Sequence, residues 1–385
     1  MLLTANNLAY YLFERGLLSA REVVDGDYMV VEATRRNRNF KVIKQDRSGL
    51  FLKQVQRRDP QSFSAVQVEA YCYRLTNQDE TFSALREIVP RFHLWDERRA
   101  VLITELLPGS EALSDYQLRT RNFPVEVATE LGRAFGQYHR EVRASNPTAP
   151  MQTMPAGSGA SPVFPGRVPW ILTLHNAAPN MLQEASGGNY QLLNLLKTYP
   201  EFGRTLDELA GSWKQETLIH GDIKWDNCVL VPSAQGGNDN GHDGMRLKLV
   251  DWELADWGDP CWDVAAIFSA FVGFWVQMLP LGPGEDVAEA IRRTEFPIEK
   301  MQPLIQRFWR AYKQEMEMSA TAAREVLRRS VLLCGARTIQ SAYEAAQKSP
   351  QLNATCLYLL QASMNILTQP DEAASELLGL TIHEA

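Results

Sequence analysis

Two polar clusters interrupt apolar segments in the second half of the chain. The first, HGDIKWDN, contains His220, Asp222, Lys224 and Asn227 between two strand-like runs. The second begins at Asp251, directly after the strand-like run RLKLV. Carboxylate and amide oxygens without a cluster of histidine or cysteine around them suit a hard cation such as Mg²⁺, and not zinc. These residue types therefore indicate a magnesium site built from two loops.

Such a site can divide the work of phosphoryl transfer between its acids. Mg²⁺ held by few protein ligands usually shares its coordination shell with substrate phosphates, and Asn227 and Asp251 are the candidate ligands. Asp222 is then left to orient and deprotonate an attacking hydroxyl. This assignment predicts that the three side chains, distant in sequence, converge around a divalent ion and the terminal phosphate of a nucleotide.

The two clusters resemble those of the aminoglycoside phosphotransferase and choline kinase family, the small-molecule branch of the protein-kinase-like fold. In that family the catalytic loop reads HGDxxxxN, and the metal-binding Asp follows an apolar strand. The resemblance implies that Asp222 is the catalytic base, that Asn227 and Asp251 bind Mg²⁺, and that His220 braces the loop. It also implies ATP as the phosphoryl donor, with GTP possible.

One residue of the first cluster is unusual for the small-molecule branch, and two further segments extend the resemblance. Lys224, two residues after the Asp, is more typical of protein Ser/Thr kinases and would touch the γ-phosphate. The segment GDPCWDVA at residues 258–265 resembles the family's GDPxxDLA segment, in which Asp263 would tie a helix to the catalytic loop. LGRAFGQYHR resembles a family helix that ends in an LH pair, and we interpret His139 there as structural.

The first 107 residues predict a small, mostly antiparallel sheet with one inserted helix. Residues 28–56 alternate as strands, and DRSG at 46–49 indicates a hairpin. A helix is expected over 62–76, and a second hairpin over 91–107. A kinase-like lobe of this kind needs a strand lysine that reaches the nucleotide phosphates and a helix glutamate that holds it.

Lys53 and Glu69 fit those two positions. Lys53 lies in the strand LFLKQV, where Phe51 shares its face and would cover an adenine. Glu69 lies three residues after Val66 and four before Tyr73, on the apolar face of the expected helix. An acid on that face needs a partner, and Lys53 is the candidate. The alternative is a solvated Glu69 and a lysine that merely decorates the strand.

The phosphate-covering loop departs from the kinase pattern, because EATRRNRNFKV contains no glycine. Arg35 and Arg38 would meet phosphate or an acidic substrate directly, and a solvated basic hairpin tip is the equal alternative. The run ITELLPG lies where the family's hinge lies, so backbone groups near Glu105 and Leu107 are expected to bind the adenine edge.

After Pro124 the chain is dominated by helical periodicity, for example in EKMQPLIQRFWRAYKQEMEM. The predicted fold is therefore α+β and bilobal, of the protein-kinase-like class, with a small antiparallel-sheet N-lobe (residues 1–107, including an N-terminal amphipathic helix) and a larger helical C-lobe (108–385). Residues 145–190 are expected to form an insertion.

Lys224, the basic loop and this insertion favour a peptide as the acceptor of the phosphoryl group.

Composition narrows the class of protein. A net charge of −7 argues against a protein that coats nucleic acid or an anionic membrane. Five scattered cysteines indicate a reduced, cytoplasmic protein without disulfides or zinc. Residues 264–284 carry no charge and are long enough to raise the question of a membrane span. A serine, a glutamine and two prolines favour a buried central helix instead.

Acids beyond the metal loop suggest what the acceptor is. Glu253 and Asp256 would line its pocket together with Asp259, and in the family such acids often recognise cationic groups, so an amine-bearing alcohol is expected. Capping of turns and helices is the alternative for each acid. We therefore expect a kinase of a small metabolite or antibiotic hydroxyl. The alternatives are a kinase of Ser or Thr in a ribosomally made precursor peptide, with a partner lyase, and a pseudokinase scaffold.

Overall fold

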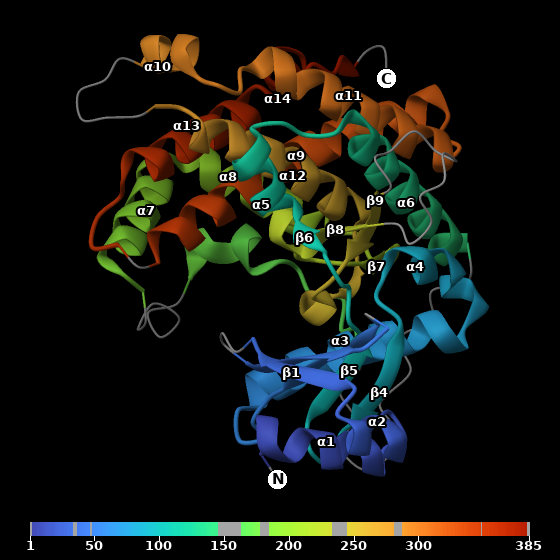
Figure 1. Cartoon of the computed structure of the whole chain (residues 1–385). Coiled ribbons are helices and arrows are strands. Elements are labelled where there is room, and N and C mark those ends of the chain that lie inside the picture. The colour runs from blue at the N-terminus through green and yellow to red at the C-terminus, as the bar shows by residue number, and fades with distance from the viewer. Residues whose placement is uncertain are drawn as a thin grey trace. The chain divides into compact units, whose positions relative to one another are not determined.

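The computed structural model describes residues 2–33, 37–46, 48–144, 163–177, 185–232, 245–280, 287–347 and 349–382. The chain divides into two compact units (Figure 1). The first unit combines Met1–Leu113 with Asp226–Ala255, and the second combines Ser114–Trp225 with Asp256–Ala385. A small antiparallel sheet lies in the first unit, and the second is mostly helical, which confirms the predicted fold class.

The first unit is built on a five-stranded antiparallel sheet with strand order β1-β2-β3-β5-β4. Its strands are β1 (Tyr28–Glu32), β2 (Arg38–Lys44), β3 (Gly49–Gln54), β4 (Phe92–Asp96) and β5 (Val101–Glu105). The helices are α1 (Ala5–Glu14), α2 (Ala20–Asp25), α3 (Pro60–Gln78) and α4 (Ser83–Ile88), with the 3₁₀ turn η1 (Glu80–Phe82). Both predicted hairpins, the amphipathic N-terminal helix and the inserted helix are therefore present.

Alternation along the strands gives the sheet two different faces, because successive side chains point to opposite sides. One face packs against α1 in a buried apolar cluster. This cluster comprises Leu3, Leu8, Tyr11, Leu12, Leu18, Phe40, Val42, Leu50, Leu52, Val101 and Ile103. The opposite face carries Lys41, Phe51, Lys53, Leu102 and Thr104, which line a cavity. Figure 1 shows α1 and α3 on opposite sides of the sheet.

A second, three-stranded sheet completes the first unit. It contains β6 (Glu111–Ala112), β8 (Cys228–Pro232) and β9 (Met245–Leu249) in the order β6-β8-β9. The 3₁₀ turn η5 (Trp252–Leu254) follows β9, and Trp252 in it is fully buried. Residues 226–255, which the sequence placed in the helical lobe, thus pack as part of the first unit.

The second unit consists of helices and one two-stranded ribbon, β7 (Thr217–Ile219) paired with β10 (Asp256–Gly258). Its elements are α5 (Leu113–Thr120), α6 (Val125–Ala144), η2 (Trp170–Asn176), α7 (Gly187–Thr198), α8 (Pro200–Gly211), α9 (Pro260–Gln277), α10 (Val287–Arg293), α11 (Ile298–Glu315), α12 (Ala320–Ala346), α13 (Ala354–Thr368), α14 (Pro370–Glu372) and η6 (Ala373–Leu377). The 3₁₀ turn η4 (Trp225–Asn227) leads from this unit into β8.

Helix α9 is the core helix of the second unit. Among the described residues it is the one helix long and apolar enough to cross a membrane, and 83% of its apolar window is buried inside the protein. Its N-terminus is set by Asp259, whose side chain accepts from the backbone N–H of Cys261, and by Pro260 in the first turn. The predicted buried central helix is therefore present.

Helices α6 and α11 approach each other closely at two glycines of α6. A Cβ atom on Gly132 would overlap the carbonyl oxygen of Phe308, and one on Gly136 would lie 2.6 Å from the Cβ atom of Glu315. Because residues four apart lie on one helix face, the missing side chains form a smooth strip along α6. This strip lets the two backbones pack closer than larger residues would allow.

A buried carboxylate ties α1 to the sheet. Asp96 at the end of β4 accepts hydrogen bonds from the Tyr11 hydroxyl (3.1 Å), the Arg15 guanidinium (2.7 Å) and the backbone N–H of Arg99 (3.1 Å). Burial alone would raise the pKa of Asp96, but the donors from Arg99, Tyr11 and Arg15 outweigh it and lower the pKa below its usual value.

The Asp96 contacts make the stability of the first unit depend on pH. A lowered pKa in the folded state means that Asp96 stabilises the fold above the unfolded-state pKa, and that this contribution is lost as the pH falls below about 4. We expect Asp96→Asn to lower the free energy of unfolding by about 1–3 kcal/mol at neutral pH. Urea unfolding at a series of pH values measures this, with the exposed Glu97→Gln as control. An equal loss at neutral and strongly acidic pH would contradict the prediction.

Candidate active site

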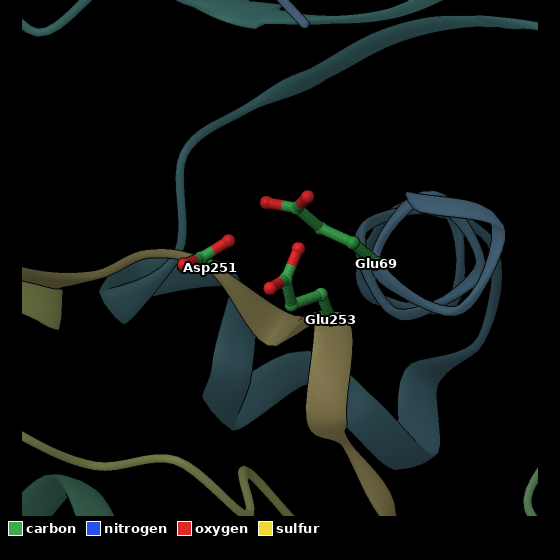
Figure 2. Close-up of side chains that lie close together, drawn as sticks. All are labelled: Glu69, Asp251 and Glu253. Carbon is green, nitrogen blue, oxygen red and sulfur yellow. The ribbon is translucent and has the colours of Figure 1, made fainter. Parts of the chain in front are cut away.

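The ammonium group of Lys53 lies among three carboxylates in the first unit. Its Nζ atom is 2.9 Å from Glu69 Oε2, 2.8 Å from Asp251 Oδ1 and 3.2 Å from Glu253 Oε2. The side chains of Lys53 and Glu69 are 11% and 6% exposed. Figure 2 shows the three carboxylates pointing toward one another, Glu69 from α3 and the other two from the segment after β9. The predicted ion pair between Lys53 and Glu69 is therefore present.

This arrangement holds Lys53 in its charged form. Burial alone would lower the pKa of Lys53, but the charges of Glu69, Asp251 and Glu253 outweigh it and raise the pKa above its usual value. Burial also raises the pKa of Glu69, which Lys53 only partly offsets. The cluster therefore places one cationic side chain among three acidic ones.

Local structure explains why these side chains meet. Glu69 lies on the buried face of α3 with Val66 and Tyr73, as the spacing predicted, and the Tyr73 hydroxyl donates to Glu69 Oε1 at 3.3 Å. Asp251 has a left-handed backbone conformation (φ 66°, ψ 56°), which is uncommon for a residue other than glycine. The chain enters η5 directly after Asp251. Glu253, two residues after Asp251, lies in this turn and contacts Lys53.

A cavity of about 480 Å³ opens beside the Lys53 cluster, a volume typical of sites for small molecules and cofactors. Phe51 and Thr104 form part of its wall from the sheet, where they are paired across β3 and β5. Glu105 and Leu107, predicted as the hinge, line the same cavity. The structure thus brings the predicted adenine-side residues and Lys53 to one place.

The β8–β9 hairpin brings the two predicted metal ligands to the same end of one sheet. Cys228 pairs with Leu249, so Asn227 lies just before the pair and Asp251 just after it. The backbone N–H of Val250 donates to the Asn227 carbonyl at 3.0 Å. Both predicted ligands line the cavity.

The basic loop before β2 is only partly described. Arg35 lies outside the described residues. Arg38 is on the α1 face of the sheet with Phe40, and its guanidinium donates to the Leu3 carbonyl at 3.2 Å. Lys41 lines the cavity instead. The alternation in RNFKV could have predicted that Lys41 lines the cavity in place of Arg38, because residues 39 and 41 share the face opposite Phe40.

The second unit contains the other predicted cluster. The Lys224 ammonium donates to Asp222 Oδ2 at 2.7 Å, and the backbone N–H of Asp222 contacts His220 Nδ1 at 3.3 Å. Asp222 itself is buried and His220 fully so. This contact supports the predicted bracing role of His220, which stays a prediction. Because Asp222 lies in one unit and Asn227 and Asp251 in the other, their convergence stays a prediction.

Asp263 on α9 holds this loop through its backbone. It accepts from the backbone N–H of His220 (2.8 Å) and Gly221 (3.1 Å), and from the Tyr138 hydroxyl (2.7 Å). Burial opposes its charge, but hydrogen bonding and charge from His139 lower the pKa of Asp263 below its usual value. The predicted tie between helix and loop is present, and the fully buried His139 belongs to the same network.

The acids predicted at the acceptor pocket are engaged elsewhere in the described structure. Glu253 contacts Lys53, as described above. Asp256 accepts from the backbone N–H groups of Gly166 (2.8 Å) and Arg167 (2.9 Å). Asp259 caps α9 and forms an ion pair with Arg329. An acceptor role for Glu253 and Asp256 stays a prediction. Their spacing in the sequence did not indicate the partners that they contact here.

The oxygen atoms at the Lys53 cluster fit a hard divalent cation. One carboxylate oxygen each from Glu69, Asp251 and Glu253 lies within 4.8 Å of the other two. The amide of Asn227 lines the same cavity. Carboxylate and amide oxygens are the ligand types that Mg²⁺ takes, but the Lys53 ammonium contacts these same three carboxylates. A Mg²⁺ site here therefore stays a prediction.

Comparison with known protein families gives a match over most of the chain. The family model described as "Phosphotransferase enzyme family" matches residues 27–312. Among curated proteins, none matches the sequence.

Several solved structures are similar to this chain. Choline kinase LicA from Streptococcus pneumoniae has 13% identity and a TM-score of 0.47, covering 94% of this chain and 99% of that one. Amicoumacin kinase hAmiN, in complex with AMP-PNP, Ca²⁺ and Ami, has 14% identity and a TM-score of 0.48, covering 96% and 98%. A putative fructosamine-3-kinase from Thermobifida fusca has 15% identity and a TM-score of 0.49, covering 95% and 100%.

Removal of the Lys53 charge tests the cluster directly. Lys53→Met leaves the three carboxylates without their cation, and we expect the free energy of unfolding to fall by about 3–5 kcal/mol. Mg²⁺ should restore part of this stability by taking the place of the ammonium, and should raise Tm more in the variant than in the wild type. Thermal unfolding with chelator and with Mg²⁺ measures both effects. Lys41→Met is the control, and a variant as stable as wild type in chelator would refute the prediction.

Proposed function

The chain belongs to the phosphotransferase enzyme family, and we propose that it transfers the γ-phosphoryl group of a nucleoside triphosphate to a hydroxyl group of a small molecule. The observation that carries this proposal is the buried Lys53 ammonium, paired with Glu69 at 2.9 Å at the edge of a cavity of about 480 Å³. ATP is the proposed donor, and GTP is the alternative.

On the donor side, the residues of the first unit bind and orient the nucleotide. Lys53 would donate to the phosphates while Glu69 holds it in place. Phe51 would cover the base, and the backbone near Glu105 and Leu107 would bind its edge. Asn227 and Asp251 would hold Mg²⁺, which when bound neutralises charge on the phosphate oxygens.

On the acceptor side, Asp222 would accept the proton of the acceptor hydroxyl. As the proton leaves, the hydroxyl oxygen forms a bond to the γ-phosphorus, and the bond from this phosphorus to the β–γ bridging oxygen breaks, releasing the nucleoside diphosphate. Lys224, which holds Asp222 Oδ2 in the described structure, would turn toward the transferred phosphoryl group or keep the carboxylate oriented.

The acceptor remains a choice between two chemical classes. We propose a hydroxyl group of a small molecule as the acceptor. A Ser or Thr hydroxyl of a peptide is the alternative. A panel of radiolabelled phosphate-transfer assays, with amine-bearing alcohols, sugars and Ser-containing peptides, separates the two, and the absence of any Mg²⁺-dependent transfer would contradict the proposal as a whole.

Asp222→Asn tests the proposed base. The amide keeps the shape of the side chain but cannot accept the proton, so we expect kcat to fall about 100- to 10,000-fold. The exposed Asp226→Asn, in the same loop, should keep at least most of the activity. Nucleotide turnover with excess Mg²⁺ measures both variants. Equal turnover in Asp222→Asn and wild type would remove Asp222 from the role of base.

Asp251→Ala tests the proposed metal ligand. Loss of one of few oxygen ligands should abolish nucleotide binding that depends on Mg²⁺, as measured by calorimetric titration of a non-hydrolysable triphosphate with and without the ion. Glu97→Ala removes the same charge from an exposed turn and serves as control. An unchanged affinity for the Mg²⁺–nucleotide complex would exclude Asp251 as a ligand.

A further inference from the structure

Arg337 on α12 contacts the Asp222 loop although more than a hundred residues separate them in sequence. Its guanidinium donates to the carbonyl oxygen of Ile223 at 3.0 Å and to that of Gly221 at 3.4 Å. These two carbonyls flank Asp222 in the chain. The side chain of Arg337 is 7% exposed. A buried arginine therefore uses its fork of donors to hold the backbone on both sides of the proposed base.

Other contacts fix the guanidinium itself. Its central carbon lies 5.1 Å from the centre of the Trp262 ring, within the range of a cation–π interaction. Gln340, one turn further along α12, accepts from the guanidinium at 3.0 Å. The indole N–H of Trp262 donates to the same Gly221 carbonyl at 3.0 Å. Trp262 and Arg337 thus both donate hydrogen bonds to the loop at the Gly221 carbonyl.

The loop is also held from its other side. Asp263 binds the N–H groups of His220 and Gly221, as described above, while Arg337 binds the carbonyls of Gly221 and Ile223. The negative Asp263 therefore binds two N–H groups that precede Asp222, and the positive Arg337 binds one carbonyl on each side of it. The guanidinium lies 3.9 Å from Asp222 Oδ1, so it also adds positive charge beside the carboxylate.

We propose that Arg337 is a positioning residue for the reaction, which holds the Asp222 loop in its working geometry through the carbonyls of Gly221 and Ile223. This inference rests on the proposed role of Asp222. Misplacement of a reacting group by about 1 Å can cost about 100-fold in rate. Loss of the Arg337 contacts should therefore lower kcat and leave nucleotide affinity nearly unchanged, since Lys53 and the cavity belong to the other unit.

Steady-state kinetics of Arg337→Met and Arg337→Lys test the proposal. We expect Arg337→Met to lower kcat about 100-fold with KM for the nucleotide within about twofold. Arg337→Lys keeps the charge but cannot bond both carbonyls. Its kcat should therefore be about tenfold above that of Arg337→Met and still about tenfold below that of wild type. Arg328→Gln is the control, because Arg328 lies on the same helix with its side chain 55% exposed. It should behave as wild type.

Chemical rescue separates positioning from packing. A cavity of about 50 Å³ lies between the loop and α12 and is lined by Asp222, Lys224, Ser269, Arg337 and Gln340. Truncation in Arg337→Ala would enlarge it, and added guanidinium ion should then raise kcat of this variant, but not of wild type or of Asp222→Asn. Full activity in folded Arg337→Met or Arg337→Lys would overturn the proposal, as would a rescue failure with normal folding.

Amide hydrogen exchange gives a reading that does not depend on activity. Arg337→Met should speed exchange at residues 220–224, whereas Arg328→Gln should not. Unchanged exchange would overturn the proposal. If wild type transfers no phosphate to any acceptor, the proposed function fails, while exchange still decides whether Arg337 holds the loop. If Arg337→Met does not fold, Arg337→Lys decides the kinetic question.

Discussion

A buried charge is tolerated in a protein only where partners of opposite sign or hydrogen-bond donors surround it. This constraint acts at the centre of each unit. In the first, Lys53 is buried among Glu69, Asp251 and Glu253. In the second, Asp263 is buried among backbone and hydroxyl donors. Lys53 joins β3 to α3 and to the segment after β9, and Asp263 joins α9 to α6 and to the loop of Asp222. Burial of each charged side chain therefore requires contact between elements that are remote in sequence.

The two centres satisfy the constraint differently. Each described hydrogen-bond partner of Asp263 is a donor, so hydrogen bonds from the backbone and from Tyr138 offset the burial of its charge. Lys53 has more acids around it than one cation can neutralise. Its contacts with Glu69, Asp251 and Glu253 mean that the ammonium would keep two carboxylate partners if one of the three turned away.

Much of the fold and part of the candidate site could be predicted from the sequence. Alternation in LFLKQV placed Lys53 and Phe51 on one face, and the spacing of Val66, Glu69 and Tyr73 placed the acid that meets the lysine. These signals are local, because strand and helix periods relate residues a few positions apart.

Contacts set by tertiary packing could not be predicted in this way. Glu253 reaches Lys53 because Asp251 adopts a left-handed conformation that residue types do not announce. Asp256 is occupied by Gly166 and Arg167, and Arg337 meets the Asp222 loop from α12. In each case the partner lies far along the chain, and no period or motif relates the two positions.

The close approach of α6 to α11 has a consequence for how this protein can vary. Tyr138 and His139, which belong to the Asp263 network, follow Gly136 on α6, and His139 also contacts the Tyr312 hydroxyl on α11. The close packing of the two helices and the buried network around Asp263 are therefore joined through the same segment of α6. A larger side chain at Gly132 or Gly136 would push the helices apart and would be expected to strain this network as well as the helix packing.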